Sequence, residues 1–187
     1  PPPPPPPASL VRHYTFDGRL TDETGSGGDL NATDAAGAPS AAAFLPQADC
    51  VIGQCASFDG NTVLVNGAPP VVGAASRSTS LWFYQPTTLA TAGLLAYGSE
   101  TTRALWEVFL YLGDVCVRVF PQFVCTTTAY TPDTWHHVAV TYHKPSRVLS
   151  IFLDGRLDAQ STLAGDLATV SSDGVVRLGV GISTLAV

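Results

Sequence analysis

Strict alternation of side chains in residues 135–142 is the feature that most narrows the fold. In this stretch, WHHVAVTY, Trp135 and His137 lie on one side of an extended strand, and His136 and Val138 lie on the other. No stretch of the chain sustains the period of about 3.6 residues that a helix requires. The pattern therefore predicts a protein built from β-strands.

Further short strands are predicted on both sides of this one. Gly and Asp-Gly turn signals separate them, as at Asp17, Asp59 and Asp154. Strands are expected at 10–16, 55–58, 62–65, 78–84, 93–97, 105–112, 115–120, 148–153, from 157 onward, and at 174–180. Residues 21–43 are rich in Gly, Asp, Thr and Ala and predict a long surface loop. Many short strands with regular turns are typical of a sandwich or a barrel.

Motifs in a fixed order resemble the laminin-G-like domains of the concanavalin-A-like superfamily. They are FDG ending at Gly18 and again at Gly60, STSLWF at 78–83, WHHVAV at 135–140, and LDG ending at Gly155. The match spans roughly residues 9–181. The resemblance implies an all-β, two-sheet antiparallel jelly-roll sandwich, predicted over 9–187, with 1–8 as a polyproline II rod or linker.

The end of the chain departs from this family. Similar domains finish with a further strand that closes the sheet carrying the first strand, and only residues 182–187 follow Gly181. The closing strand is then divergent, lies beyond residue 187, or comes from a neighbouring chain. An unpaired edge is a template for strand addition, which favours assembly with copies of the chain or with other extracellular chains.

The aromatic and histidine residues of the motifs predict packing rather than chemistry. Trp82 and Trp135 are expected to fill the space between the sheets, with sugar stacking as the alternative. His136 and His137 point to opposite faces, so they cannot chelate one ion together. Both are expected to occupy ordinary sheet positions.

Four cysteines form two short-range pairs. Four cysteines allow three connectivities, and local pairing, Cys50 with Cys55 and Cys116 with Cys125, is the simplest. The stretch between Cys116 and Cys125 predicts a hairpin. Zinc knuckles need CxxC-type spacing, which neither pair has. We therefore predict two disulfides and an oxidising, extracellular compartment.

The proline run at the start of the chain and the sparse surface charge suggest glycosylation. Seven consecutive prolines must form a polyproline II rod about 20 Å long. The run is similar to those of hydroxyproline-rich glycoproteins, which implies hydroxylation and O-glycosylation at Pro2, Pro3, Pro4, Pro5, Pro6 and Pro7. Asn31 begins an N-glycosylation sequon, Asn-Ala-Thr. Only 13% of residues are charged, so attached sugar would help to cover the surface.

Calcium is the one ion that the resemblance suggests. Laminin-G-like domains often hold calcium at the rim, and Asp17, Asp22, Asp29 and Asp59 lie in or beside the first Gly-rich loop and a neighbouring turn. These residues are either solvated turn aspartates or the ligands of a structural calcium. No other cofactor is required.

Composition and motifs exclude several functions. Nine basic residues in a chain of net charge −6 provide no patch for nucleic acid, and no apolar run is long enough to span a bilayer. The fold also hosts glycosidases, but the acidic pair two residues apart on one strand that they need is missing. Glu100 and Glu107 lie seven residues apart. The chain is therefore predicted not to be an enzyme.

The prediction for function is a non-catalytic extracellular structural glycoprotein module, a subunit of a surface fibre, filament or wall-like matrix. The alternative is a calcium-dependent glycan-binding or adhesion module of the lectin type. These two hypotheses differ in what the surface should show: a rim groove with an exposed aromatic for a lectin, and the proline rod docked on a neighbour for a subunit.

Proline modification can be checked directly. The N-terminal peptide of protein secreted by its natural host should carry hydroxyl groups and pentoses or hexoses on residues 2–7. Mass spectrometry of that peptide measures both, and a peptide with bare proline would refute the prediction.

Overall fold

The computed structural model of the chain describes residues 10–67, 69–88, 91–169 and 175–179. The proline run, with its predicted rod and its predicted modification at residues 2–7, lies outside these ranges. The predicted departure from the family after Gly181 lies outside them as well.

Within these ranges the secondary structure is almost entirely β. The strands are β1 (Asn31–Asp34), β2 (Ala43–Leu45), β3 (Cys55–Ser57), β4 (Thr62–Asn66), β5 (Arg77–Tyr84), β6 (Thr91–Gly98), β7 (Leu105–Tyr111), β8 (Asp114–Val119), β9 (Gln122–Cys125), β10 (Trp135–His143), β11 (Val148–Leu153), β12 (Arg156–Thr162) and β13 (Val176–Leu178). The helix described is the short 3-10 helix η1 (Gln47–Asp49). No helix in the described part of the chain is long and apolar enough to cross a membrane.

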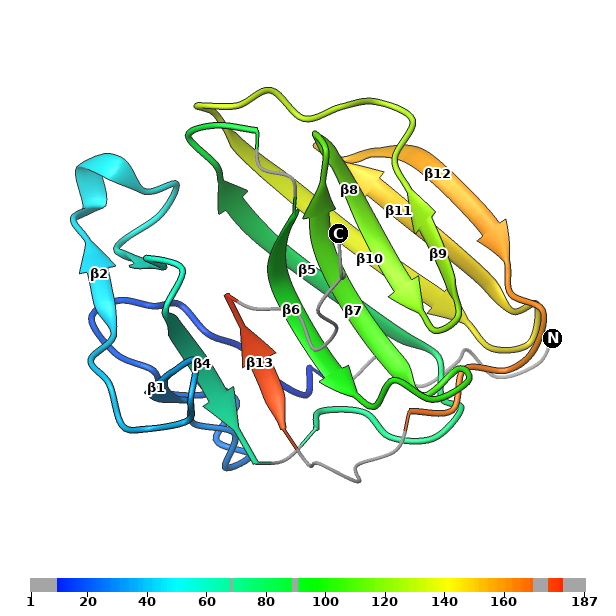
Figure 1. Ribbon diagram of the computed structural model, residues 1–187, viewed down its shortest axis with the longest axis horizontal. Coiled ribbons are helices and arrows are strands. Elements are labelled where there is room, and N and C mark those ends of the chain that lie inside the picture. The colour runs from blue at the N-terminus through cyan, green and yellow to red at the C-terminus, as the bar shows by residue number, and fades with distance from the viewer. Residues whose placement is uncertain (1–9, 68, 89–90, 170–174, 180–187) are drawn as a thin grey trace, which may run out of the picture.

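Two antiparallel sheets pack face to face. The larger has the strand order β1-β4-β13-β6-β7-β8-β9 and the smaller the order β12-β11-β10-β5, while β2 and β3 form a separate pair. Figure 1 shows β6, β7, β8 and β9 in front of β5, β10 and β11. This arrangement confirms the predicted all-β antiparallel sandwich of the jelly-roll type.

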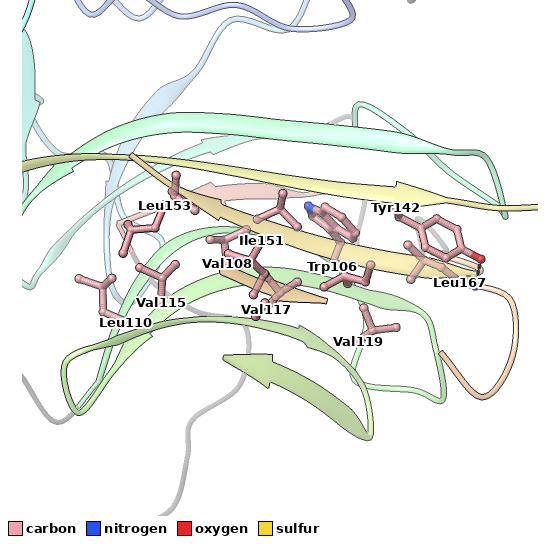
Figure 2. Packing of buried hydrophobic residues seen from close by; sticks show 14 of the residues in the cluster. Trp106, Val108, Leu110, Val115, Val117, Val119, Tyr142, Ile151, Leu153 and Leu167 are labelled. Carbon is pink, nitrogen blue, oxygen red and sulfur yellow. Dashed lines mark hydrogen bonds between the residues drawn. The ribbon is translucent and has the colours of Figure 1, made fainter. Parts of the chain in front are cut away.

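The hydrophobic core lies between the two sheets and follows the alternation of the strands. Figure 2 shows Trp106 and Val108 of the larger sheet close to Tyr142 and Ile151 of the smaller sheet. All four side chains are fully buried. Each residue that a strand places in this core leaves its neighbours on the outer face of the sheet.

The predicted alternation of residues 135–142 is confirmed, but the prediction that Trp82 and Trp135 fill the core is wrong. Val138 and the residues in step with it are buried, so Trp135 lies on the outer face. Trp82 is 49% exposed on the same face. The large core aromatic is instead Trp106. Both faces of these strands carry large side chains, so the alternation alone does not identify the buried face.

The N-terminal part differs from the predicted strand pattern. Residues 10–16 were expected to form a strand, but they have no regular secondary structure and are tied down by local hydrogen bonds. His13 N donates to Asp22 Oδ1 at 3.1 Å, and Glu23 N donates to His13 O at 2.8 Å. Within the predicted loop 21–43, β1 forms because it pairs with the buried strand β4. Its polar sequence gave no strand signal.

Both predicted disulfides are present in the structure. Cys50 and Cys55 are joined across a loop, and Cys116 and Cys125 are joined between directly opposite positions of β8 and β9. The second bridge confirms the predicted hairpin.

Candidate functional site

The outer face of the larger sheet carries the first candidate site. Strand register places Glu107, Arg118 and Phe123 in one row across β7, β8 and β9. Through Ala96 of β6, the row continues to Arg177 of β13. Neighbouring strands lie about 4.8 Å apart, so the row is about 19 Å long. We call Glu107, Phe109, Tyr111, Arg118, Phe123 and Arg177, which all lie on this face, the arginine face.

Arg118 is held in place by two carboxylates and an aromatic ring. Its Nε lies 3.6 Å from Glu107 Oε2, and its Nη1 lies 4.0 Å from Glu100 Oε1. Its Cζ lies 5.0 Å from the centroid of the Phe109 ring, within the range of a cation–π interaction. Arg118 and Glu107 are both buried, so salt screens this pair less than it screens a surface pair.

Aromatic side chains surround the guanidinium of Arg118. A hollow of about 60 Å³ is lined by Phe109, Tyr111, Arg118 and Phe123. Tyr111 is 38% exposed and Phe123 is 60% exposed, so both rings are accessible to a ligand.

Arg177 adds a polar group to the same row. Its Nη1 is buried and has no hydrogen-bond partner among the described residues.

Sequence reasoning missed the arginine face. It considered Glu107 only as a catalytic acid together with Glu100, and it did not connect either residue with Arg118. The outward positions of β7 follow from alternation once Trp106 is known to be buried. The pairing of β7 with β8 beyond the tight turn predicts Arg118 opposite Glu107, and this was the available signal.

The outer face of the smaller sheet carries a second cluster of aromatic residues, at its β5 edge. Trp82 packs against His137 with ring centroids 5.1 Å apart, and Tyr84 packs against Trp135 at 5.7 Å. We call Ser80, Trp82, Tyr84, Trp135 and His137 the tryptophan face.

His136 and Asp154 form a structural pair. His136 is buried, with Nδ1 2.8 Å from Asp154 Oδ2 and Nε2 2.9 Å from Thr131 O. Burial would raise the pKa of Asp154, but its hydrogen bonds with His136 and with the backbone of His137 lower it below its usual range. The two histidines lie on opposite faces of β10, as predicted.

A larger hollow of about 430 Å³ lies at the rim, beside the turn between β11 and β12. It is lined in part by Thr127, Thr128 and Asp158. Asp158 Oδ1 already accepts hydrogen bonds from the backbone N–H groups of Thr127 and Thr128. None of the described residues that line this hollow is aromatic, and both of its carboxylates, Asp154 and Asp158, are hydrogen-bonded within the protein.

Asp22 is the centre of a hydrogen-bond network in the first loop. Its carboxylate is buried and accepts hydrogen bonds from His13 N, Thr24 N, Thr24 Oγ1 and Ser26 Oγ. Arg12 Nη1 lies 3.5 Å from Asp22 Oδ2. Burial by itself would raise the pKa of Asp22, but the hydrogen bonds from Thr24 and His13 outweigh it and hold the pKa well below its usual range.

The structure brings together two of the four aspartates considered for calcium. Asp29 Oδ1 accepts a hydrogen bond from Asp22 N at 2.8 Å. Asp17 instead accepts from Gln54 N, and Asp59 accepts from the backbone of its own turn. In the described ranges, no group of three or more His, Cys, Asp or Glu is placed to hold a metal ion. A structural calcium stays one of the two alternatives given by the sequence.

The sequon asparagine lies at an accessible position. Asn31 is the first residue of β1, and its side chain is exposed. Glycosylation of Asn31 stays a prediction.

One family matches most of the chain. Residues 59–184 match the family described as Concanavalin A-like lectin/glucanases superfamily. No curated protein sequence matches the chain.

Solved structures share the fold at low sequence identity. Domain 4 of AbnA, a GH43 extracellular arabinanase from Geobacillus stearothermophilus, was solved in complex with arabinotriose. It is 19% identical at a TM-score of 0.72, over 94% of this chain and 85% of that one. The receptor binding domain of botulinum neurotoxin D is 13% identical at a TM-score of 0.56, over 86% of this chain and 42% of that one. The botulinum neurotoxin serotype D ligand binding domain in complex with N-acetylneuraminic acid is 11% identical at a TM-score of 0.56, over 83% and 39%.

The Asp22 network predicts a pH-dependent stability. Asp22→Asn should lower the free energy of unfolding at neutral pH by about 1.5–3 kcal/mol, because hydrogen bonds to a charged group are weakened. Since the folded pKa is lowered, this contribution is complete above the unfolded value of about 3.9 and is lost as the pH falls through the folded pKa. Urea unfolding of both proteins at neutral and strongly acidic pH should show the difference shrinking in acid. A difference that stays constant would contradict the role of the carboxylate.

Calcium can be tested by thermal melting. Because protein donors already surround Asp22, we expect neither added calcium nor EDTA to change Tm. A Tm that rises with calcium and falls with EDTA would instead support the ion site predicted from the sequence.

Proposed function

The chain belongs to the concanavalin A-like lectin/glucanases superfamily, and we propose that it is a non-catalytic, extracellular carbohydrate-binding module whose arginine face binds the glycan. The observation that carries this proposal is the buried Arg118–Glu107 pair beside the exposed rings of Tyr111 and Phe123. Ligand sites in proteins typically combine apolar walls with a few fixed polar groups in this way.

The chemistry of the arginine face suits a sugar. A sugar ring presents an apolar C–H surface, which can stack on Tyr111 or Phe123, and a rim of hydroxyls. Arg118, which lines the hollow, would donate hydrogen bonds to these hydroxyls, and the buried Glu107 would hold Arg118 in place. Their mutual contact fixes both groups before binding, so little side-chain entropy is lost.

The charge of the face favours a neutral glycan. Arg118 lies within 4.0 Å of both Glu100 and Glu107, so its positive charge is offset by two carboxylates. When Arg177 of the same row is included, the formal charges of the two arginines and the two glutamates sum to zero. A sialylated or uronic-acid glycan would gain little from such a surface.

The comparisons support glycan binding over the structural role that the sequence first suggested. One structure of the same fold was solved with arabinotriose, and another was solved with N-acetylneuraminic acid. The two disulfides agree with an extracellular location. The absence of catalysis and the identity of the sugar belong to the proposal.

Glycan binding should depend on the exposed ring of Phe123. In isothermal titration calorimetry against neutral oligosaccharides, including arabinotriose, and against sialyllactose, the wild type should bind a neutral member of the panel best. Phe123→Ala should weaken that binding about tenfold or more, because the stacking surface is removed. Phe123→Tyr keeps a ring and should retain binding.

Ile52→Ala serves as the control, because Ile52 is an exposed apolar residue in the loop between η1 and β3, outside the larger sheet. Equal binding by wild type and Phe123→Ala, or no binding across the panel, would refute the proposed site. Release of reducing sugar from any oligosaccharide would show an enzyme instead.

A further inference from the structure

The tryptophan face exposes large aromatic surface that the proposed glycan site does not use. Trp82 is 49% exposed and Tyr84 is 41% exposed, side by side on the outer face of the smaller sheet. Among the described residues, β5 is an edge strand of that sheet, so the cluster lies at an open border. Adjacent exposed aromatic residues of this kind mark binding surfaces more often than inert ones.

The rings of this face are fixed in place before any ligand arrives. Trp135 Nε1 donates to Asp49 O at 3.0 Å, and the Tyr84 hydroxyl donates to Asp133 Oδ1. Trp82 is packed against His137. A ligand would therefore find ordered aromatic walls, which reduces the entropy lost on binding.

The polar groups of the face match a ligand that only accepts hydrogen bonds. Within the described part of the chain, the indole N–H of Trp82 donates to no other residue, and Ser80 adds a hydroxyl two residues away. The face itself carries no Asp, Glu, Lys or Arg. A sugar offers many donors and favours free carboxylates in its site, whereas the Asp133 carboxylate beside this face already accepts a hydrogen bond from Tyr84.

We infer that the tryptophan face docks the proline run, residues 1–7, of a second copy of this chain when that run is unmodified. A polyproline II rod has no N–H groups, exposes its carbonyl oxygens and is uncharged, so it needs aromatic walls and donors from its partner. The sequence supplies seven consecutive prolines in every copy.

The rod is longer than the distance between the two rings of the face. Trp82 and Tyr84 are two residues apart on one strand face, which separates their Cα atoms by about 6.8 Å. A polyproline II rod of seven residues is about 20 Å long, so it is long enough to cross both rings.

The first test uses an unmodified heptaproline peptide and the full chain expressed in bacteria, which leaves proline unmodified. The peptide should bind a full-length Pro3→Gly/Pro5→Gly variant, whose own run is broken, and should quench or shift its tryptophan fluorescence. Adding Trp82→Ala to that variant should weaken binding about tenfold or more. Adding Val72→Ala, an exposed apolar change outside the face, should leave binding unchanged.

The second test asks whether the occupant comes from another copy. In analytical ultracentrifugation the wild type should self-associate with rising concentration, while Trp82→Ala alone and Pro3→Gly/Pro5→Gly alone should stay monomeric. An equimolar mixture of these two variants should form a heterodimer, because one supplies an intact run and the other an intact face. Circular dichroism confirms that each variant is folded.

Three results would overturn the inference. The first is a peptide that fails to bind the broken-run variant. The second is a peptide that binds that variant while the wild type stays monomeric, which would place the run on its own domain. The third is a neutral oligosaccharide whose binding is lost in Trp82→Ala but kept in Phe123→Ala, which would make this face the glycan site. Loss of glycan binding in Phe123→Ala tests only the arginine face, so the two proposals fail separately.

Discussion

The two-residue period of the β-strand is the constraint on which the rest of this structure depends. A strand in a sandwich turns every second side chain toward the core, so the residues before and after each core residue point to the outer face. Burial of Trp106 and Val108 in β7 places Glu107 and Phe109 outside. Burial of Val138 in β10 places His137 outside in the same way. Both candidate binding surfaces are therefore consequences of how the core is filled.

The two outer faces differ in the polar groups that accompany their exposed aromatic residues. On the arginine face, the arginine of a buried ion pair lines a hollow together with aromatic rings. On the tryptophan face, the polar tips of Tyr84 and Trp135 are tied to neighbouring loops, and the ring faces remain open. The first arrangement suits a ligand rich in hydroxyls, and the second suits a stiff ligand that lacks donors.

The sequence predicted the class of fold, the hairpins and both disulfides, because these depend on local alternation and turn chemistry. The turn between β11 and β12 shows this, since Asp154 and Gly155 both adopt the positive φ that an Asp-Gly pair allows. Prediction from the sequence failed where the structure depends on pairing between strands that are distant in the chain. β1 is a strand only because β4 lies beside it, and Trp82 is exposed because Phe83, and not Trp82, faces the core. The contact between Arg118 and Glu107 required the register of two strands, which the motifs did not contain.

The back-to-back placement of the two faces has a mechanical consequence. The sheets meet through their inner faces, so ligands on the two outer faces would pull in opposite directions. Such tension acts across the sandwich, at right angles to the hydrogen bonds within each sheet. It is resisted by the packed cluster between the sheets, where Trp106, Tyr142 and Ile151 meet (Figure 2). The force that this module could bear between a glycan and a neighbouring chain would thus be set by its apolar interior. A larger force would separate the two sheets and would not break the hydrogen bonds between strands one at a time.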